Sequence, residues 1–358
     1  MIHSPLYELD IPEGLADVVQ SDLLERCAGT VDPQRIVAGS SFIRLNCPDV
    51  RCILTLPTVN AVYQVLSYNI PRPKALLGHE HWTRLLIAVE AVSSSSSGTF
   101  HSFHINAAGS DSSVMQRIRT TFAQDTGLHY APDEGDMLLR IRPGESGWEV
   151  LIRMTPRPLS TRNWRICNYE GALNGPVARS MVMLSSPGKD DYVLNVGCGS
   201  GSLLIERLLH TESQRVVGID INNTAIDCAS QNLASADRTR DAVLLTGDAR
   251  RLPFKDASFT HLYADLPFGQ LVGSHQTNQQ LYPHLLREAA RVAGVNALFT
   301  LITHEVRLMD TVLKAQMAWQ VDHRRMVTYV DYIRAFISCA VCKASPSPDS
   351  QAVLHCRL

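Results

Sequence analysis

The chain has little of what marks secreted or membrane proteins. It contains no uninterrupted apolar stretch near the roughly 20 residues that a membrane-spanning helix needs. No basic and apolar signal segment stands at its N-terminus, so we expect no secretory route. Its nine cysteines are scattered within apolar segments, a pattern typical of a reducing cytoplasm rather than of a disulfide framework. The sequence therefore predicts a cytoplasmic location and free thiols.

The sequence also lacks the spacing of a metal site. Cys339 and Cys342 form a CxxC pair, but no second pair follows at the spacing of zinc ligands. The pair lies in an apolar run that predicts a buried strand. No cluster of acids or cysteines accompanies the histidines. We therefore predict buried thiols and no bound metal.

A third absence is an excess of positive charge. The 33 Lys and Arg residues against 35 Asp and Glu give a formal net charge of −2, whereas a nucleic-acid-binding protein is expected to be basic. Positive charge is instead local, with four arginines and no acid between residues 151 and 169, and two more at alternate positions of a predicted strand. Arginine forks suit phosphate, although charge runs are often only solvated surface. The candidate RNA-binding residues are Arg140, Arg142, Arg153, Arg157, Arg162 and Arg165.

Length and composition predict more than one domain. A chain of 358 residues, with 45% hydrophobic and 19% charged residues, suits two or three domains with ordinary cores. Five serines at 93–97 predict a flexible linker between the first two. A second hinge is predicted at Pro156, Pro158 and Ser160. Between these hinges the pattern predicts a strand, a helix over 113–126 and two further strands.

The second half of the chain has the pattern of successive strand–helix units. An apolar run at 192–196 predicts a buried parallel strand, and a glycine-rich loop at 197–201 leads into a leucine-rich helix. Glycines at alternate positions allow a sharp turn and the close approach of a ligand. The helix N-terminus behind them favours a carboxylate or a phosphate. Nucleotide-binding and methyl-donor-binding folds share such a loop, so it does not choose between them.

Three further apolar runs predict strands, and each ends at an acid: Asp220, Asp248 and Asp265. Open α/β sheets bind ligands at the carboxyl ends of their strands, so we expect these acids and the glycine loop to share one cleft. A pyrophosphate is disfavoured, because the loop lacks the third glycine of G-x-G-x-x-G and no P-loop lysine follows. S-adenosylmethionine fits better, with its ribose at Asp220, its adenine near Asp248 and its methyl group toward Asp265.

The segment after the fourth strand indicates what receives the methyl group. A carboxylate and a backbone carbonyl can hold a planar exocyclic amine by two hydrogen bonds, while an aromatic ring stacks on its base. Such an amine is a poor nucleophile because its lone pair is delocalised into the ring, so the lone pair must be aimed. The alternative is a strand that simply ends in a proline turn. The candidate catalytic residues are Asp265, Leu266, Pro267 and Phe268.

These motifs resemble a known family. Residues 165–343 are similar to the methyltransferase domain of THUMP-domain RNA guanosine-N2 methyltransferases, through the glycine loop and Asp265-Leu266-Pro267-Phe268-Gly269. Further matches are Gly171-Ala172-Leu173-Asn174, Gly273-Ser274-His275 and Leu281-Tyr282-Pro283. The commoner motif has a second proline where this chain has Leu266, and the present form resembles the eukaryotic-type branch of the family.

The resemblance implies the fold and the domains. Residues 11–15 and 99–153 resemble, less closely, the start of the ferredoxin-like domain and the THUMP module of the same family. The implied fold is α/β: a Rossmann-like class I methyltransferase domain with a seven-stranded, mostly parallel sheet, preceded by an α+β ferredoxin-like and THUMP module. The predicted boundaries are 1–95 for the ferredoxin-like domain, 96–160 for the THUMP domain, 161–345 for the methyltransferase domain and 346–358 for a C-terminal tail.

The resemblance also implies the activity. It is methyl transfer from S-adenosylmethionine to the N2 amine of a guanosine in tRNA, held by its acceptor stem and 3′ end, with position 6 as the usual target. A small activator subunit accompanies eukaryotic relatives. Two alternatives stay open: a methyltransferase for another base amine such as adenine N6 in RNA or DNA, and an RNA-binding protein that binds the cofactor without catalysis. The predicted cofactor-binding residues are Asn174, Asn195, Gly197, Gly199, Gly201, Asp220, Ile221, Asp248, Ala249 and Asp265.

Overall fold

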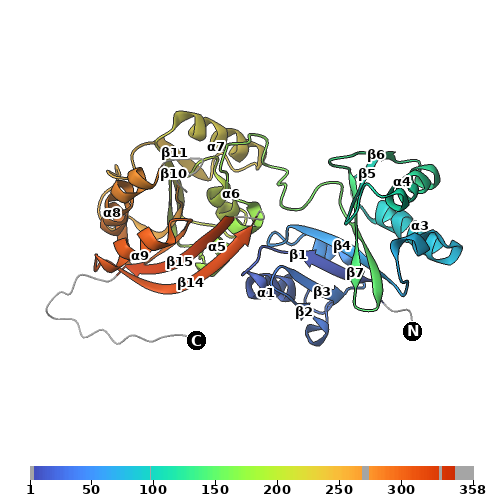
Figure 1. The fold of residues 1–358 in the computed structure, drawn as a ribbon. Coiled ribbons are helices and arrows are strands. Elements are labelled where there is room, and N and C mark those ends of the chain that lie inside the picture. The colour runs from blue at the N-terminus through green and yellow to red at the C-terminus, as the bar shows by residue number, and fades with distance from the viewer. Residues whose placement is uncertain (1–3, 97, 268–273, 330–332, 343–358) are drawn as a thin grey trace. The chain divides into compact units, whose positions relative to one another are not determined.

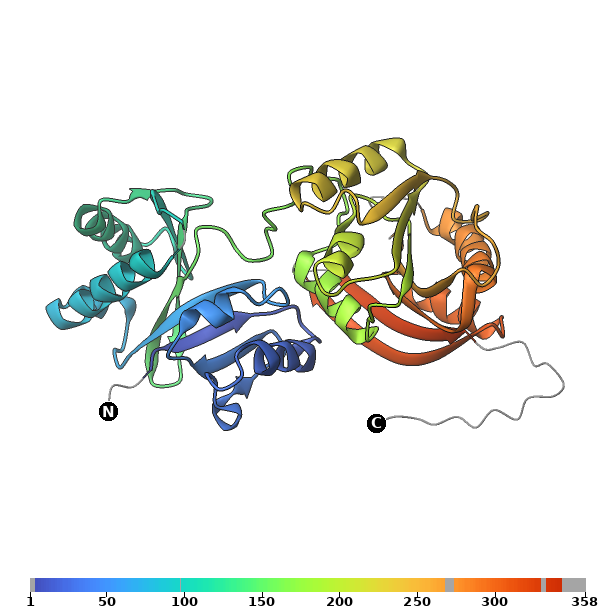
Figure 2. The ribbon, with the colours of Figure 1, turned by 180° about the vertical axis from the view of Figure 1, so that it is seen from behind.

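The structure is a computed structural model that describes residues 4–96, 98–267, 274–329 and 333–342. It divides into two compact units, an N-terminal unit over Met1–Arg162 and a C-terminal unit over Asn163–Leu358 (Figures 1 and 2). Phe268 and the predicted tail at 346–358 lie outside the described residues. The finer division of the N-terminal unit at residue 95 stays a prediction.

The N-terminal unit is built on one eight-stranded sheet (Figure 1). Its strands are β1 (Leu6–Asp10), β2 (Val37–Ala38), β3 (Phe42–Asn46), β4 (Ala61–Tyr68), β5 (Ser102–Ala107), β6 (His129–Tyr130), β7 (Met137–Gly144) and β8 (Gly147–Arg153). Their order is β2-β3-β1-β4-β8-β7-β5-β6. Strand β4 pairs antiparallel with β8, from Tyr63 opposite Arg153 to Tyr68 opposite Trp148. One hydrogen-bonded sheet therefore runs through the whole unit.

Helices pack into the apolar core on one face of this sheet. They are α1 (Ala16–Arg26), α2 (Val50–Leu54), α3 (His79–Ser95) and α4 (Ser113–Thr126), with the 3₁₀ turns η1 (Pro33–Arg35) and η2 (Pro73–Leu77). The predicted helix over 113–126 is confirmed as α4, which Ser112 caps by accepting a hydrogen bond from the Met115 N–H. Helices α3 and α4 meet edge to face at Trp82 and Phe122, 6.3 Å between ring centroids.

The serine linker predicted at 93–97 is wrong for its first three residues. Ser93–Ser95 continue α3 to its end. The Ser93 hydroxyl donates to the Val89 carbonyl at 2.9 Å, which satisfies a polar group inside the helix. The apolar side of the same turn is anchored by Val92, which is fully buried. Packing therefore outweighs the modest helix propensity of serine.

The C-terminal unit has the predicted seven-stranded, mostly parallel sheet. Its strands are β9 (Tyr192–Val196), β10 (Arg215–Asp220), β11 (Ala242–Thr246), β12 (Phe259–Asp265), β13 (Ala293–Thr303), β14 (Trp319–Tyr329) and β15 (Ile333–Cys342). The order is β11-β10-β9-β12-β13-β15-β14, parallel from β11 to β13, with β15 antiparallel to both neighbours. Strands β10 and β12 flank β9 on opposite sides, which makes the end of β9 a switch point where open sheets bind ligands.

Helices flank this sheet on both faces. They are α5 (Gly175–Leu184), α6 (Ser202–Leu208), α7 (Asn223–Ser235), α8 (His275–Val292) and α9 (Val306–Lys314). Helices α8 and α9 share a core with one face of the sheet, through residues such as Leu285 and Met309 against Leu194 and Val217. Helices α5 and α6 lie on the opposite side (Figures 1 and 2).

Helix α8 begins earlier than the sequence predicted. The sequence pattern predicts a polar loop up to residue 280 and a helix over 281–292, but the helix starts at His275. Ser274 caps it, since its hydroxyl accepts from the Thr277 N–H at 3.2 Å. The polar first turns have one buried residue, Asn278. They therefore lack the apolar stripe by which a helix is recognised from sequence.

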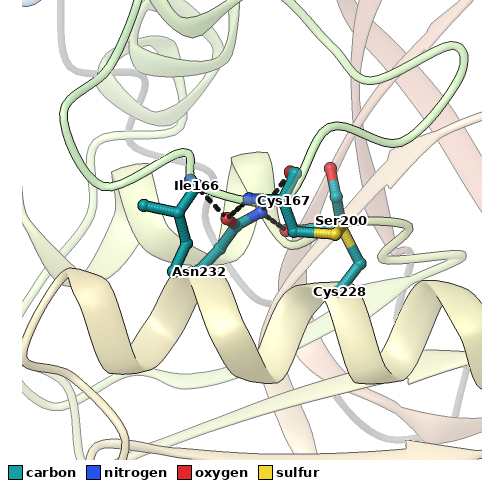
Figure 3. The surroundings of a disulfide bond; sticks show 5 residues. All are labelled: Ile166, Cys167, Ser200, Cys228 and Asn232. Carbon is teal, nitrogen blue, oxygen red and sulfur yellow. Dashed lines mark hydrogen bonds between the residues drawn. A yellow bond between two sulfur atoms is a disulfide. The ribbon is translucent and has the colours of Figure 1, made fainter.

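The predicted absence of disulfides is wrong for one pair. Cys167 and Cys228 form a disulfide that joins the segment before α5 to helix α7, with their Cα atoms 5.4 Å apart (Figure 3). The two residues are separated by 61 positions in sequence, so only the fold brings them together. Within the described parts of the chain, no helix has the length and apolar character needed to cross a membrane.

Candidate active site

A cavity of about 430 Å³ opens at the carboxyl ends of the central strands. It lies between the glycine loop after β9, the ends of β10 and β12, and the first turns of α8. Most of the residues predicted from the sequence to bind the ligand line it: Asn195, Gly197, Gly199, Asp220, Ile221, Asp248, Ala249, Asp265, Leu266 and Pro267. The structure therefore brings the glycine loop and the three acids to one place.

The glycine loop presents bare backbone to this cavity. Gly197 and Gly199 have φ angles of 62° and 53°, and a Cβ added to either would meet no atom within 4 Å. The positive φ explains why glycine is used, and the open space gives a ligand room to approach the chain. The Gly199 N–H donates to Asp220 Oδ2 at 2.8 Å, while the Asn222 N–H donates to Oδ1 at 2.9 Å. Asp220 is thereby held in place, and each oxygen keeps a lone pair for a further donor.

Asp248 is held in a different way. Arg250 binds its carboxylate with two nitrogens, and the shorter contact, from Nη2, is 2.7 Å. These hydrogen bonds lower the pKa of Asp248, so it is ionised at neutral pH. A carboxylate at this position can accept a hydrogen bond from an amino group of a ligand.

Two buried carbonyl or carboxyl oxygens of residues that line the cavity have no hydrogen-bond partner among the described residues. They are Oδ1 of Asn195 and Oδ1 of Asp265. The Asn195 amide is oriented by its Nδ2 atom, which donates to the Tyr263 carbonyl at 3.2 Å. Burial raises the pKa of Asp265 to about 8, well above the ordinary value of 3.8. Buried acceptors without a donor are costly and rare, so both point to a ligand that donates hydrogen bonds.

The turn after β12 is fixed by its neighbours. The Leu266 N–H donates to the Ile302 carbonyl at 3.0 Å, which continues the pairing with β13. The Pro267 carbonyl accepts from Asn278 Nδ2 at 2.9 Å and from the Tyr282 hydroxyl at 3.1 Å. The chain beyond β12 is thus anchored by α8. The stacking role predicted for Phe268 lies outside the described residues.

The comparison with family models gives this arrangement an identity. Residues 162–332 match UPF0020, described as RMKL-like, methyltransferase domain. Residues 162–332 belong to this methyltransferase family. Part of the chain is 30% identical, over 169 residues, to the tRNA (guanine(6)-N(2))-methyltransferase THUMP3 of Mus musculus. Another match is the tRNA (guanine(6)-N2)-methyltransferase of Methanocaldococcus jannaschii, 24% identical over 221 residues.

These matches confirm the family predicted for the methyltransferase domain, but they do not span whole relatives. They cover 44% of this chain and 33% of the mouse protein, and 51% of this chain and 58% of the archaeal one. Solved structures share the fold over most of the chain. TrmN from Thermus thermophilus has a TM-score of 0.74 at 18% identity, covering 94% of this chain and 99% of that one. A putative methyltransferase, SMU.472, solved in complex with SAH, has a TM-score of 0.69 at 12% identity, covering 97% and 100%.

The hydrogen bond from the Tyr282 hydroxyl to the Pro267 carbonyl can be tested by mutation. Tyr282→Phe removes a hydroxyl that contacts Pro267 O and also Thr303 Oγ1, the latter at 2.7 Å. We expect a loss of about 1–2 kcal/mol of unfolding free energy and a fall in kcat of about 10-fold, because the turn loses its position. Urea unfolding and steady-state kinetics measure both.

Tyr263→Phe is the matched control for that variant. It also deletes a buried tyrosine hydroxyl, one that is bonded to Ser185 Oγ, just after α5, at 2.5 Å. A similar loss of stability with unchanged kcat is expected. An equal fall in kcat for both variants would mean that the turn is not what Tyr282 positions.

Two predicted cofactor-binding residues do not line the cavity of the methyltransferase domain. Asn174 caps α5, and its side chain accepts from the Val177 N–H at 3.2 Å. Gly201 starts α6 with a φ of 85°. Residues missed from the sequence include Tyr169, Thr277 and Gln280, which do line the cavity. The Gly171-Ala172-Leu173 motif is close to Tyr169 in sequence. Nothing in the sequence pattern indicated Thr277 and Gln280, because the polar residues 275–280 do not predict the start of a helix.

Two of the arginines predicted to bind RNA, Arg140 and Arg142, are engaged with acids of their own unit. Both extend from β7 to the face of the sheet opposite the helices, as the alternation of a strand requires. Arg140 Nη1 contacts Asp10 at 3.0 Å, and Arg142 Nη2 contacts Glu8 at 2.5 Å. Glu8 and Glu149 also bind Arg44. The positive charge of this face is therefore largely neutralised.

The remaining arginines divide by exposure. Arg153 is 5% exposed and donates to backbone carbonyls, including those of Gly135 and Asp136 at 3.0 Å. The prediction that Arg153 contacts RNA does not fit this burial. Arg162 donates to the carbonyls of Leu159 and Pro57, whereas Arg157 is exposed. RNA contact by the exposed and partly exposed arginines stays a prediction.

Proposed function

We propose that this protein transfers a methyl group from S-adenosylmethionine to the N2 amine of a guanosine in tRNA, at position 6 of the acceptor stem. Support for the reaction comes from the methyltransferase domain. Support for the substrate comes from the relatives, both of which are tRNA guanine(6)-N2 methyltransferases. The similarity covers only part of those proteins, so the activity of the whole chain is a proposal.

One observation carries the proposal. Asp265 ends β12, which pairs with β9, the strand that leads into the glycine loop. It lines the cavity and has a buried oxygen without a donor among the described residues. An exocyclic amine has two N–H groups, and one of them can supply the missing hydrogen bond. The Leu266 carbonyl follows directly in the chain and is the proposed acceptor for the second N–H. The amine would then be held while its lone pair faces the cofactor.

The residues around the cavity suit S-adenosylmethionine. Gly197 and Gly199 leave room beside the backbone for its amino acid part. The positioned carboxylate of Asp220 suits two ribose hydroxyls, and that of Asp248 suits an adenine amino group. Asn195 offers an unused acceptor to the ammonium group. When bound, the cofactor supplies an electrophilic methyl group on a sulfonium.

The protein contributes position and a proton acceptor. Asp265 and the Leu266 carbonyl would orient N2, so that its lone pair faces the methyl group that the bound cofactor would supply. The nitrogen becomes cationic and must lose one proton. Burial raises the pKa of Asp265 in the ligand-free fold, but a hydrogen bond donated by the amine favours the carboxylate form, which takes that proton. Closure of the turn by Asn278 and Tyr282 keeps these acceptors in place during transfer.

The target base must leave its stem to reach such a cavity. A paired guanine presents N2 in the minor groove, so flipping the nucleotide out is required. Stacking on an aromatic side chain recovers roughly 1–3 kcal/mol per base, which is the role proposed for Phe268. Binding of the acceptor stem and 3′ end by the N-terminal unit, a small activator subunit and a cytoplasmic location stay predictions.

The test is nucleoside mass spectrometry of unmodified tRNA incubated with the protein and isotope-labelled S-adenosylmethionine. N2-methylguanosine is the expected product, and sequencing of the RNA fragments gives its position. Labelled N6-methyladenosine would support the adenine alternative instead. Cofactor binding without any labelled nucleoside would support the non-catalytic RNA-binding alternative.

A further inference from the structure

One wall of the cavity is an irregular stretch of chain before α5. Residues 165–173, which we call the rim segment, contain no helix or strand. Five of them, Tyr169, Glu170, Gly171, Ala172 and Leu173, line the cavity. Their position cannot come from a hydrogen-bonded ladder, so side chains must hold the rim segment in place.

The buried amide of Asn232 holds it most directly. This residue lies on α7 and has no exposed surface. Its Oδ1 accepts from the N–H groups of Ile166 and Cys167 at 3.0 and 2.9 Å. Its Nδ2 donates to the carbonyl of Cys167 at 3.1 Å and to that of Ser200, in the glycine loop, at 3.0 Å. Figure 3 shows the amide between these backbone groups.

The amide oxygen thus accepts two hydrogen bonds and the amide nitrogen donates two, all with backbone groups of two segments. Ile166 and Cys167 belong to the rim segment, and Ser200 belongs to the glycine loop. Both Ser200 and residues 169–173 line the cavity. Asn232 itself does not line it, so it stands behind the cavity and ties together two of its walls.

We propose that Asn232 is a positioning residue for S-adenosylmethionine, which sets the distance between the rim segment and the glycine loop. This inference rests on the proposed function, because it takes that cofactor as the ligand. Loss of the amide removes four hydrogen bonds to backbone groups, one of which, the Ile166 N–H, also donates to the Trp164 carbonyl at 3.0 Å. These groups then turn toward water, and the rim segment moves away from the glycine loop.

Other ties keep the rim segment attached when Asn232 is lost. The disulfide joins Cys167 to α7. Arg165 Nη2 donates to the Leu173 carbonyl at 2.7 Å and to Ser202 Oγ at 2.9 Å, closing the segment on itself and on α6. The Tyr169 hydroxyl accepts from Asn222 Nδ2 at 2.9 Å. A substitution at Asn232 therefore displaces a tethered segment and leaves the fold of the domain in place.

The decisive variant is Asn232→Leu, which keeps the branched shape of the side chain and removes all four hydrogen bonds. Calorimetry should show S-adenosylmethionine binding about 10-fold more weakly, while kcat at saturating cofactor stays within about threefold of wild type. Hydrogen exchange in the ligand-free protein should speed up at the Cys167 amide, and less at the Ile166 amide, which keeps its bond to the Trp164 carbonyl. This exchange reports the position of the segment without any reaction.

Leu233→Ala is the matched control. Leu233 is buried on the same helix, and its side chain makes none of these bonds. It should lower thermal stability while leaving the cofactor affinity and the exchange of the two amides unchanged. Equal effects of both variants on affinity would show that Asn232 only stabilises α7, and the proposal would be wrong.

A second variant and a reductant complete the test. Asn232→Asp keeps the two acceptor contacts and loses both donations, so an intermediate loss of affinity is expected even if Asn232→Leu does not fold. Dithiothreitol reduces the disulfide to two thiols and is itself oxidised to a cyclic disulfide. It should weaken binding further in the Asn232 variants and by less than about threefold in wild type. Wild-type affinity in Asn232→Asp would refute the positioning role, whereas no binding by wild type would refute the proposed function.

Discussion

Replacing Asp265 by alanine is expected to reduce kcat for methyl transfer by about 10³-fold or more. The variant loses both the acceptor that holds the N2 amine and the group that takes its proton. Affinity for S-adenosylmethionine should stay within about threefold, because the glycine loop, Asp220 and Asp248 are untouched. Single-turnover methylation of tRNA and calorimetry with the cofactor measure the two quantities on the same preparation.

Asp248→Ala is the matched control, since it removes another acid from the same cavity. It should weaken cofactor binding and raise the KM for S-adenosylmethionine, with a much smaller change in kcat at saturation. The kinetics would then distinguish the two acids, with Asp265 affecting kcat and Asp248 affecting cofactor binding. Nearly full turnover by the Asp265 variant would remove the assigned role and leave the proline-turn alternative.

The sheet of the C-terminal unit could be predicted because its strands are buried on both faces. Such strands are short continuous apolar runs, as at 192–196, and each is followed by a polar tip. The predicted strand at 192–196 coincides with β9. Because parallel strands have their carboxyl ends at the same edge of the sheet, the residues that follow them lie close together. The proximity of Asp220, Asp248 and Asp265 therefore follows from the topology.

The parts that were missed depend on contacts between residues distant in sequence. Asn232 and its partners Ile166 and Ser200 are far apart in the chain, and an asparagine on a helix carries no mark of what it will bond. The same holds for the disulfide of Cys167. The ion pairs of Arg142 were missed for a related reason, since the acids that pair with it lie on β1 and β8. A count of charges along a short stretch of sequence does not include the acids that sheet formation brings next to these arginines.

The raised pKa of Asp265 gives the second large effect, on stability. In the ligand-free fold its pKa is about 8, against 3.8 for an unperturbed aspartate. Between these values the folded protein keeps the proton that the unfolded chain releases, so stability falls as pH rises from about 4 to about 8. Asp265→Asn removes this titration. Relative to wild type, the variant should therefore gain roughly 3–4 kcal/mol of unfolding free energy between pH 5 and pH 8.

Urea unfolding of the ligand-free protein at several pH values measures this gain. Other groups with shifted pKa, such as His261 and His304, whose values are lowered by burial, contribute equally to both proteins and cancel in the difference. A difference that does not change with pH would mean that Asp265 Oδ1 already has a donor in solution. A clear gain would show that the fold keeps an unfavourable carboxyl at the end of β12. A donor bound there then relieves the cost, which is why the same substitution should stabilise the protein and abolish its reaction.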